Sequence, residues 1–239
     1  MRIYHTSDLH DHGGIAAPLA ALRANEPGLL FDCGDSLRGS QTVYHRSEPI
    51  IAEMDRAGYD AQALGNREFH YLYALFCNRI RAMHRPVVCA NLTDTKGRPL
   101  PFTDHVRLNT AHGKIYLTGL LIMQYAEGSF WEKIFGWRFL DPATVIAQHA
   151  ARVEPGEAFI VLSHLGLSLD RKLAAAVPRI DLLLGGHSHD TLFEPQYVGR
   201  VPIVHAGPYG KHVSVSDLQP DPRDGTFALT NFTLAPLLP

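Results

Sequence analysis

The chain has 239 residues, 46% of them hydrophobic, so it can bury one sizeable core or two small ones. The formal net charge is −2 and no cluster of lysine and arginine stands out, which argues against binding a nucleic-acid duplex through its phosphates. No apolar run approaches the ~20 residues that span a bilayer, and the first residues lack a secretory pattern, so we expect a cytoplasmic protein without a membrane segment.

Apolar strands and helical patterns alternate in the first part of the chain. The hydrophobic spacing predicts helices at 15–25, 47–59 and 71–84, between strands at 2–7, 28–35, 60–66 and 85–92. The second helix is expected to be capped by Ser47, to carry Pro49 in its first turn and to end at Gly58. Such alternation is typical of an α/β fold with mainly parallel strands.

The second part of the chain continues the alternation and then changes to short strands. We predict a hairpin at 105–121 with its turn near His112, helices at 141–153 and 170–178, and strands at 157–166, 179–187, 202–210, 211–219 and 226–235. The last strands are expected to join the fold antiparallel. Residues 128–137 are predicted as a long loop, whose Trp131, Phe135 and Trp137 either pack on the body or form a lid over a ligand.

Groups that can bind a metal follow five of the predicted strands. In chain order they are Asp8, His10 and His12, then Asp35, then Asn66, then His164, then His187 and His189. Ligands of open α/β sheets bind beyond the carboxyl ends of the strands, so these side chains are expected to meet at one edge. Any one of these motifs is weak evidence, because a lone histidine is more often structural. Five placements of the same kind favour a single site.

The donor types indicate the chemistry. Carboxylate, imidazole and amide groups suit borderline divalent metals, with manganese as first choice and iron, zinc, cobalt and nickel as alternatives. Seven donors exceed the four of a closed tetrahedral site, which favours two metals sharing a carboxylate. Gly185 and Gly186 would let the backbone turn close to the metals. His187 and His189, two apart on an extended segment, are expected to point the same way.

Five motifs resemble those of the calcineurin-like metallophosphoesterase family. They are Asp8-Leu9-His10, Gly34-Asp35, Gly65-Asn66-Arg67-Glu68, His164 and Gly186-His187-Ser188-His189. The chain is most similar to the catalytic domain of 5′-nucleotidases and 2′,3′-cyclic-nucleotide phosphodiesterases, through "HTSDLH", "GDSLRGS", "ALGNREFHY" and "VHAGPYGKHVSVSDL". The resemblance covers nearly the whole chain and implies a four-layer αββα fold, with two packed mixed β-sheets flanked by helices.

The resemblance also implies a role for each motif residue. The first metal would be held by Asp8, His10 and His189, the second by Asn66, His164 and His187, and Asp35 would bridge the two. Catalytic roles are expected for Arg67, Asn66 and His12. Arg67 stands where the family usually has a histidine that protonates the leaving group or acts in the transition state. Arginine can bind phosphate oxygens but is a poor acid, so His12 and His70 are the nearest substitute donors.

These observations together predict a dinuclear metal-dependent phosphoester hydrolase, in which a metal-bridging hydroxide attacks phosphorus in line. The substrate would be a small phosphodiester such as a cyclic nucleotide, slightly preferred, or a phosphomonoester such as a nucleotide. The family's nucleotidases usually carry a C-terminal domain that stacks on the base. Because the sequence ends at Pro239, we expect residues 1–239 to be a single catalytic domain without it.

Three alternatives stay open at this point. The chain is a non-catalytic metal-binding module, a mononuclear zinc hydrolase, or a catalytic subunit that acts only with a partner domain. Retention of all seven donors argues against the first, and a need for Asp35 as a bridge would argue against the second. Pairing with a second copy or with a partner subunit is equally open.

Overall fold

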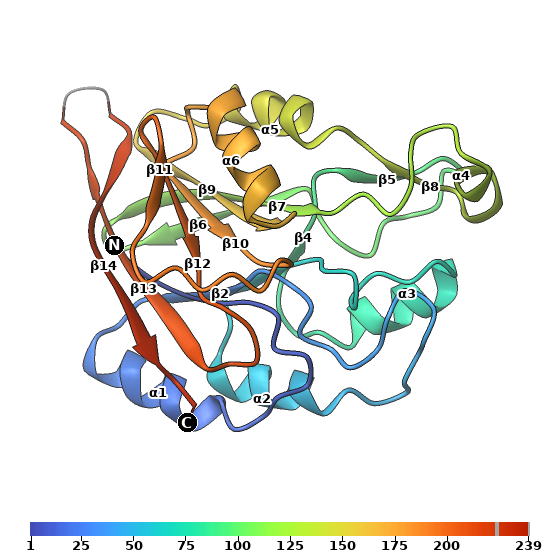
Figure 1. Cartoon of the computed structure of the whole chain (residues 1–239), viewed down its shortest axis with the longest axis horizontal. Helices are drawn as coiled ribbons and strands as arrows, with labels where there is room; N and C mark the ends of the chain where they lie inside the picture. The colour runs from blue at the N-terminus through green and yellow to red at the C-terminus, as the bar shows by residue number, and fades with distance from the viewer. Residues whose placement is uncertain (223–224, 239) are drawn as a thin grey trace.

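Two six-stranded sheets lie face to face in the computed structural model, which describes residues 1–222 and 225–238 (Figure 1). The first sheet has the order β14-β13-β1-β2-β3-β4. Its strands are β1 (Arg2–Thr6), β2 (Leu29–Asp32), β3 (Ala61–Ala63), β4 (Val87–Val88), β13 (His212–Pro220) and β14 (Phe227–Pro236). Strands β1 to β4 run parallel, whereas β13 and β14 are antiparallel additions at one side.

The second sheet has a parallel centre with an antiparallel strand at each edge. Its order is β11-β12-β10-β9-β7-β6, and its strands are β6 (His105–Thr110), β7 (Gly113–Leu121), β9 (Glu157–His164), β10 (Leu182–Gly185), β11 (Gln196–Val198) and β12 (Val201–His205). The predicted hairpin is confirmed as β6 and β7. The antiparallel prediction is wrong for β12, which runs parallel to β10 because the hairpin with β11 reverses the chain first.

Helices cover the outer faces of both sheets (Figure 1). The first sheet carries α1 (Ala16–Asn25), α2 (Pro49–Ala57) and α3 (Tyr73–Arg81), and the second carries α5 (Pro142–Ala150) and α6 (Leu167–Ala176). Along β7, Ile115 and Leu117 pack between the sheets while Tyr116 packs toward the helices. This alternation buries both faces of the central strands, as parallel sheets require. The predicted αββα arrangement is confirmed.

The start of α2 differs from its prediction. The helix begins at Pro49 after the N-cap residue Glu48, whose side chain makes no capping hydrogen bond, so Ser47 does not cap it. The carboxylate of Glu48 instead accepts the backbone N–H of Arg38 at 3.1 Å. The prediction that Gly58 ends the helix is confirmed, because this residue has a left-handed φ of 72°.

The predicted long loop at 128–137 contains a short helix, α4 (Phe130–Phe135). The Ser129 hydroxyl accepts the Glu132 N–H at 3.3 Å, and Gly136 ends the helix with a φ of 85°. Trp137 is fully buried and opens β8 (Trp137–Phe139), which pairs with β5 (Leu92–Asp94). In the part of the chain that is described, no helix is long and apolar enough to cross a membrane.

Candidate metal centre

The predicted donors lie at the carboxyl ends of parallel strands from both sheets. Asp8 and His10 follow β1, Asp35 follows β2 and Asn66 follows β3 in the first sheet. From the second sheet, His164 is the last residue of β9, and two further histidines, His187 and His189, follow β10. Since the sheets face each other, their loops meet at one edge of the molecule.

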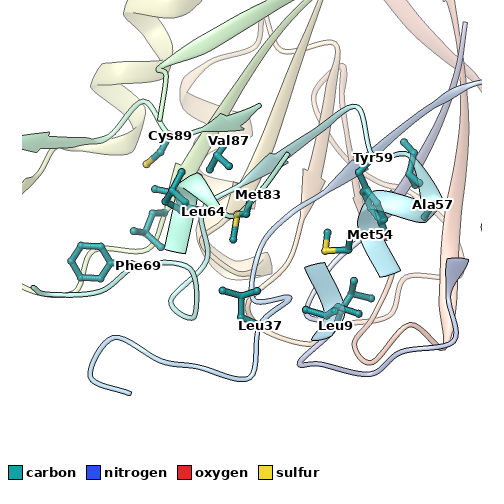
Figure 2. Close-up of a cluster of buried hydrophobic side chains, with 14 of the residues drawn as sticks. Leu9, Leu37, Met54, Ala57, Tyr59, Leu64, Phe69, Met83, Val87 and Cys89 are labelled. Carbon is teal, nitrogen blue, oxygen red and sulfur yellow. The ribbon is translucent and has the colours of Figure 1, made fainter. Parts of the chain in front are cut away.

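Buried leucines hold three of these loops in place. Leu9, Leu37 and Leu64 are fully buried in one cluster beneath the first sheet, where Figure 2 shows them. Leu9 lies between two donors in the chain, and the other two leucines lie within two residues of Asp35 and Asn66. Burying a leucine contributes about 1.5–3 kcal/mol, so the loops are fixed by packing before any ligand binds.

One group of donors consists of Asp8, His10 and His189. The two imidazoles approach through Nε2 atoms 2.9 Å apart, and Asp8 Oδ1 lies 3.9 Å from the first and 3.6 Å from the second. Metal–nitrogen bonds of about 2.1 Å would place donors about 3–3.5 Å apart, which is close to these separations. Two imidazole nitrogens this close require a proton or a cation between them.

The second group consists of Asp35, Asn66, His164 and His187. His164 Nε2 lies 3.3 Å from Asp35 Oδ1, and Asn66 Nδ2 lies 3.4 Å from His187 Nδ1. Asp8 connects the two groups, because its carboxylate accepts the His187 N–H at 3.0 Å and comes within 4.8 Å of donor atoms of Asp35 and His164. The structure therefore brings all seven predicted donors into one cluster.

His164 is held in a tautomer that suits a ligand. Its Nδ1 donates to the carbonyl of Cys33 at 2.7 Å, so the buried Nε2, which makes no hydrogen bond, points at the carboxylates. Burial lowers the pKa of His164, but the carboxylates of Asp35, Asp8 and Glu68 outweigh burial and raise it to about 10. The raised pKa shows that this pocket favours positive charge.

Burial and charge act differently on the other imidazoles. Burial and then Arg67 lower the pKa of His10 to about 4, and burial and then His164 lower the pKa of His187. Neutral imidazole is the form that binds metals. His189 has 38% of its side chain exposed while Asp8 is fully buried, so solvent reaches the cluster from the His189 side.

Left-handed backbone is concentrated at this cluster. The described non-glycine residues with positive φ all belong to it or adjoin it, namely Asp8, His10, Asp11, Asp35, His187, His189 and Tyr209. The prediction that 187–189 is extended is therefore wrong, since the φ angles of its two histidines are 75° and 58°. Contact between the His187 N–H and Asp8 imposes this turn, and the two rings point into different donor groups.

The paired glycines serve two different contacts. A Cβ on Gly186 would lie 2.9 Å from Asp8 Oδ2, so the predicted close approach to the cluster applies to this residue. A Cβ on Gly185 would instead collide with the buried pair of His205 and Asp170, whose atoms lie 2.8 Å apart. Gly185 is needed for packing between β10 and β12 rather than for the cluster.

Arg67 faces a cavity of about 350 Å³ that also opens onto His10, Asp35 and Asn66. Its N–H donates to Asp35 Oδ1 at 2.8 Å, and its guanidinium donates to the carbonyls of Leu37 and Arg38. The side chain is thus tied to the loop after β2. Its remaining donors are placed for an anion in the cavity.

The two candidate proton donors lie in different environments. His12 is exposed, with Nδ1 2.9 Å from the Leu9 carbonyl and its ring 4.7 Å from the ring of Tyr209. His70 is 3% exposed, and its Nδ1 accepts the Leu72 N–H at 3.0 Å. Of the two candidates, His70 is therefore buried and His12 is open to solvent.

Sequence reasoning assigned no role to Glu68, which organises the loops after β2 and β3. Its buried carboxylate accepts the N–H groups of Asp35 at 2.7 Å, Ser36 at 2.9 Å and Gly65 at 2.9 Å. Burial, followed by the charges of Asp35 and Asp32, raises the pKa of Glu68 to about 7. The sequence signal for this role was the place of Glu68 at the end of the motif Gly65-Asn66-Arg67-Glu68.

Arg79 and Tyr209 were also missed. Arg79, on α3, is 3% exposed, and its guanidinium donates to carbonyls of the loops at 40–43 and 67–69. Tyr209 lies beside the rings of His10, His12 and His189 at 5.6, 4.7 and 5.6 Å. A lone arginine on an apolar helix face was the only sequence signal for Arg79.

Comparison with known proteins relates the chain to phosphoesterases. The family model described as calcineurin-like phosphoesterase matches residues 1–191. An uncharacterized metallophosphoesterase of Bacillus subtilis, YunD, is 29% identical over 242 residues, which cover 92% of this chain and 50% of that protein. Mouse 5′-nucleotidase is 28% identical over 255 residues, covering 91% of this chain and 42% of that protein. The chain thus spans about half the length of these relatives.

Solved structures share the fold. A 5′-nucleotidase precursor from Thermus thermophilus superposes with a TM-score of 0.81 at 23% identity, covering 100% of this chain and 54% of that one. The calcineurin-like phosphoesterase YfkN from Bacillus subtilis gives a TM-score of 0.76 at 22% identity, covering 99% and 90%. At these identities the likeness establishes the architecture of the chain.

Proposed function

The chain belongs to the calcineurin-like phosphoesterase family, and from this premise we propose that it hydrolyses small phosphoesters with two divalent metal ions held at the strand ends. The observation that carries the proposal is the convergence of seven donors from five strand ends, with imidazole nitrogens of His10, His189 and His164 within 4 Å of the carboxylates of Asp8 and Asp35. The buried His164 Nε2 makes no hydrogen bond with the described residues and lies 3.3 Å from Asp35 Oδ1, as expected of a nitrogen that shares a cation with that carboxylate.

The donor groups suggest how the metals would be shared. One ion would be held by Asp8, His10 and His189, the other by Asn66, His164 and His187, and Asp35 would contact both. When bound, such ions act as Lewis acids that activate water and polarise a phosphoryl oxygen. We propose manganese as the ion of first choice, with iron, zinc, cobalt and nickel as alternatives.

The chain's own groups would bind and orient the ester. Arg67 lines the cavity next to Asp35 and would pair with phosphoryl oxygens, offsetting negative charge as it grows in the transition state. Asn66 borders the same cavity and would orient the phosphoryl group. Since Arg67 cannot give up a proton, a poor leaving group would depend on another donor, for which we propose the exposed His12.

A nucleotide-like substrate is the proposed class, either a monoester or a cyclic diester. Support comes from the relatives, since a mouse protein that resembles the chain is a 5′-nucleotidase. All seven donors and Arg67 come from within residues 1–239, so we propose that this chain forms one catalytic unit. A partner-dependent subunit is the alternative.

The test is to remove metal, restore Mn²⁺, and measure turnover of a matched aryl phosphate monoester and diester. Asp35→Ala should abolish turnover. Asp104→Ala is the control, because Asp104 lies in a separate Asp–His group with His105 and His149. The proposal is supported if the wild type and Asp104→Ala show metal-dependent turnover and Asp35→Ala does not. Two bound metals without turnover would indicate the non-catalytic or partner-dependent alternative, and one metal per chain would indicate a mononuclear site.

A further inference from the structure

An aromatic cavity of about 350 Å³ opens beside the candidate metal centre. Its walls are four aromatic side chains and two polar ones, namely Tyr71, Tyr125, Trp131, Phe135, Thr42 and Gln124. This volume lies at the lower end of the range of small-molecule sites, and aromatic walls with few polar groups are typical of them. Among the residues that the structure describes, no charged side chain lines the cavity.

The aromatic rings form a stack with one open end. Phe135 lies 4.9 Å from Tyr71 at 20°, and Trp131 lies 6.0 Å from Phe135 at 9°. Tyr71 continues the series to Tyr125 at 6.3 Å and 21°. Trp131 ends the stack and is 52% exposed, with the ring of Phe130 edge-on to it at 5.9 Å and 63°. Nearly parallel rings that end on an exposed indole present a surface on which another planar ring can stack.

Two glutamines connect this cavity to the metal centre. Gln124 Nε2 donates to Asn66 Oδ1 at 3.0 Å, and Gln41 Nε2 donates to Gln124 Oε1 at 3.0 Å. Gln41 lines the cavity of Arg67, and the next residue, Thr42, lines the aromatic cavity. The two cavities therefore share a wall. A ligand whose anionic end lies beside Arg67 would extend past Gln124 to the rings.

The two cavities differ in the chemistry that they offer. The one beside Asp35 carries the cationic Arg38 and Arg67, whereas the neighbouring one offers aromatic faces, a hydroxyl and an amide. Building on the proposed function, we propose that the aromatic cavity binds a planar aromatic ring in the alcohol part of the phosphoester substrate. A nucleobase and a simple aryl group share this chemistry, and the choice of esters distinguishes them.

The first experiment compares kcat/KM of the Mn²⁺-loaded protein for adenosine 5′-monophosphate and ribose 5-phosphate. In Trp131→Ala the ratio of the two should fall about 5- to 150-fold, which is the range that corresponds to about 1–3 kcal/mol for stacking of one base. The control is Phe193→Ala, an aromatic residue that is 73% exposed, lies outside the cavity walls and contacts His212 with its ring, and it should leave the ratio unchanged. If Trp131→Ala lowers kcat/KM for 4-nitrophenyl phosphate by the same factor as for adenosine 5′-monophosphate, the cavity binds aryl groups in general. If kcat/KM for 4-nitrophenyl phosphate is unchanged, the cavity binds a nucleobase.

A binding measurement separates failure of this inference from failure of the proposed function. In metal-free protein, adenosine 5′-monophosphate should quench the emission of Trp131, while ribose 5-phosphate should not. The other tryptophan, Trp137, is fully buried, and Trp131→Phe supplies the blank. Quenching without hydrolysis of any ester would uphold the cavity and refute the proposed function.

Two results would overturn the inference itself. The first is metal-dependent hydrolysis of ribose 5-phosphate with neither quenching nor a change of ratio in Trp131→Ala, which leaves the proposed function intact. The second is a Trp131→Ala protein with an unchanged ratio but an altered molar mass by light scattering, which would assign this face to self-association.

Discussion

Replacing Arg79 by lysine tests how the loops of the candidate site are held. The guanidinium lies on α3 and donates to the carbonyls of Ser40 at 3.1 Å, Arg67 at 2.6 Å, Phe69 at 2.9 Å and Val43 at 2.8 Å. It therefore fastens the loop after β3, which carries Asn66 and Arg67, to the loop after β2. An ammonium group keeps the charge but cannot reach both loops at once.

The expected magnitude follows from these contacts. A hydrogen bond from a charged donor contributes about 1.5–3 kcal/mol, and Arg79 is 3% exposed, so water cannot replace what is lost. If lysine loses two of these bonds, Arg79→Lys should lower the free energy of unfolding by about 3–6 kcal/mol. The freed loop should also weaken manganese binding, because Asn66 loses its fixed position.

Urea denaturation and titration calorimetry with Mn²⁺ measure the two effects. Arg81→Lys is the matched control, since Arg81 is the last residue of the same helix and is exposed. We expect the control to stay within about 0.5 kcal/mol of the wild type. Arg79→Lys with unchanged stability and unchanged manganese affinity would refute the role assigned to this residue.

Two further predictions concern pH and the leaving group. Burial lowers the pKa of His149 from 6.5 to about 4, so the folded state resists its protonation and stability should fall as pH drops from about 6.5 toward 4. Neutral His149 contributes about 3 kcal/mol to the free energy of unfolding above pH 6.5. Because glutamine does not titrate, the difference in urea midpoint between wild type and His149→Gln should shrink as pH falls from about 6.5 to 4. A difference that stays constant over this range would contradict the prediction. Arg67→His should raise turnover of alkyl phosphates about tenfold or more relative to nitrophenyl phosphates, by supplying an acid. Equal effects on both esters, with Arg67→Ala as control, would disprove the leaving-group explanation.

The order of strands and helices was predictable because burial imposes a period on the sequence. Strand-end donors such as Asp35 and His164 followed from the same logic, since a strand that ends in a turn presents its next side chains at the sheet edge. The direction of β12 was not predictable in this way. It depends on whether β11 forms a hairpin first, which only pairing in three dimensions decides.

The rest of the site depends on contacts between distant segments. Gln124 meets Asn66 across 58 positions of sequence, and the left-handed turn at His187 depends on Asp8, 179 positions away. Arg79 stands on the apolar face of its helix, but the sequence does not show which loops its guanidinium contacts. Helix α4 was missed for a different reason, since its signals were the cap residues Ser129 and Gly136 rather than its aromatic periodicity.

The left-handed backbone of the donor residues sets stability against metal binding in this protein. Each such residue costs about 1–2 kcal/mol, while a folded domain is stable by only about 5–15 kcal/mol. Glycine at Asp35 or His187 would relieve the cost and delete a donor. Selection for heat resistance alone would therefore tend to erase the site, whereas selection for manganese retention would preserve it at the expense of melting temperature.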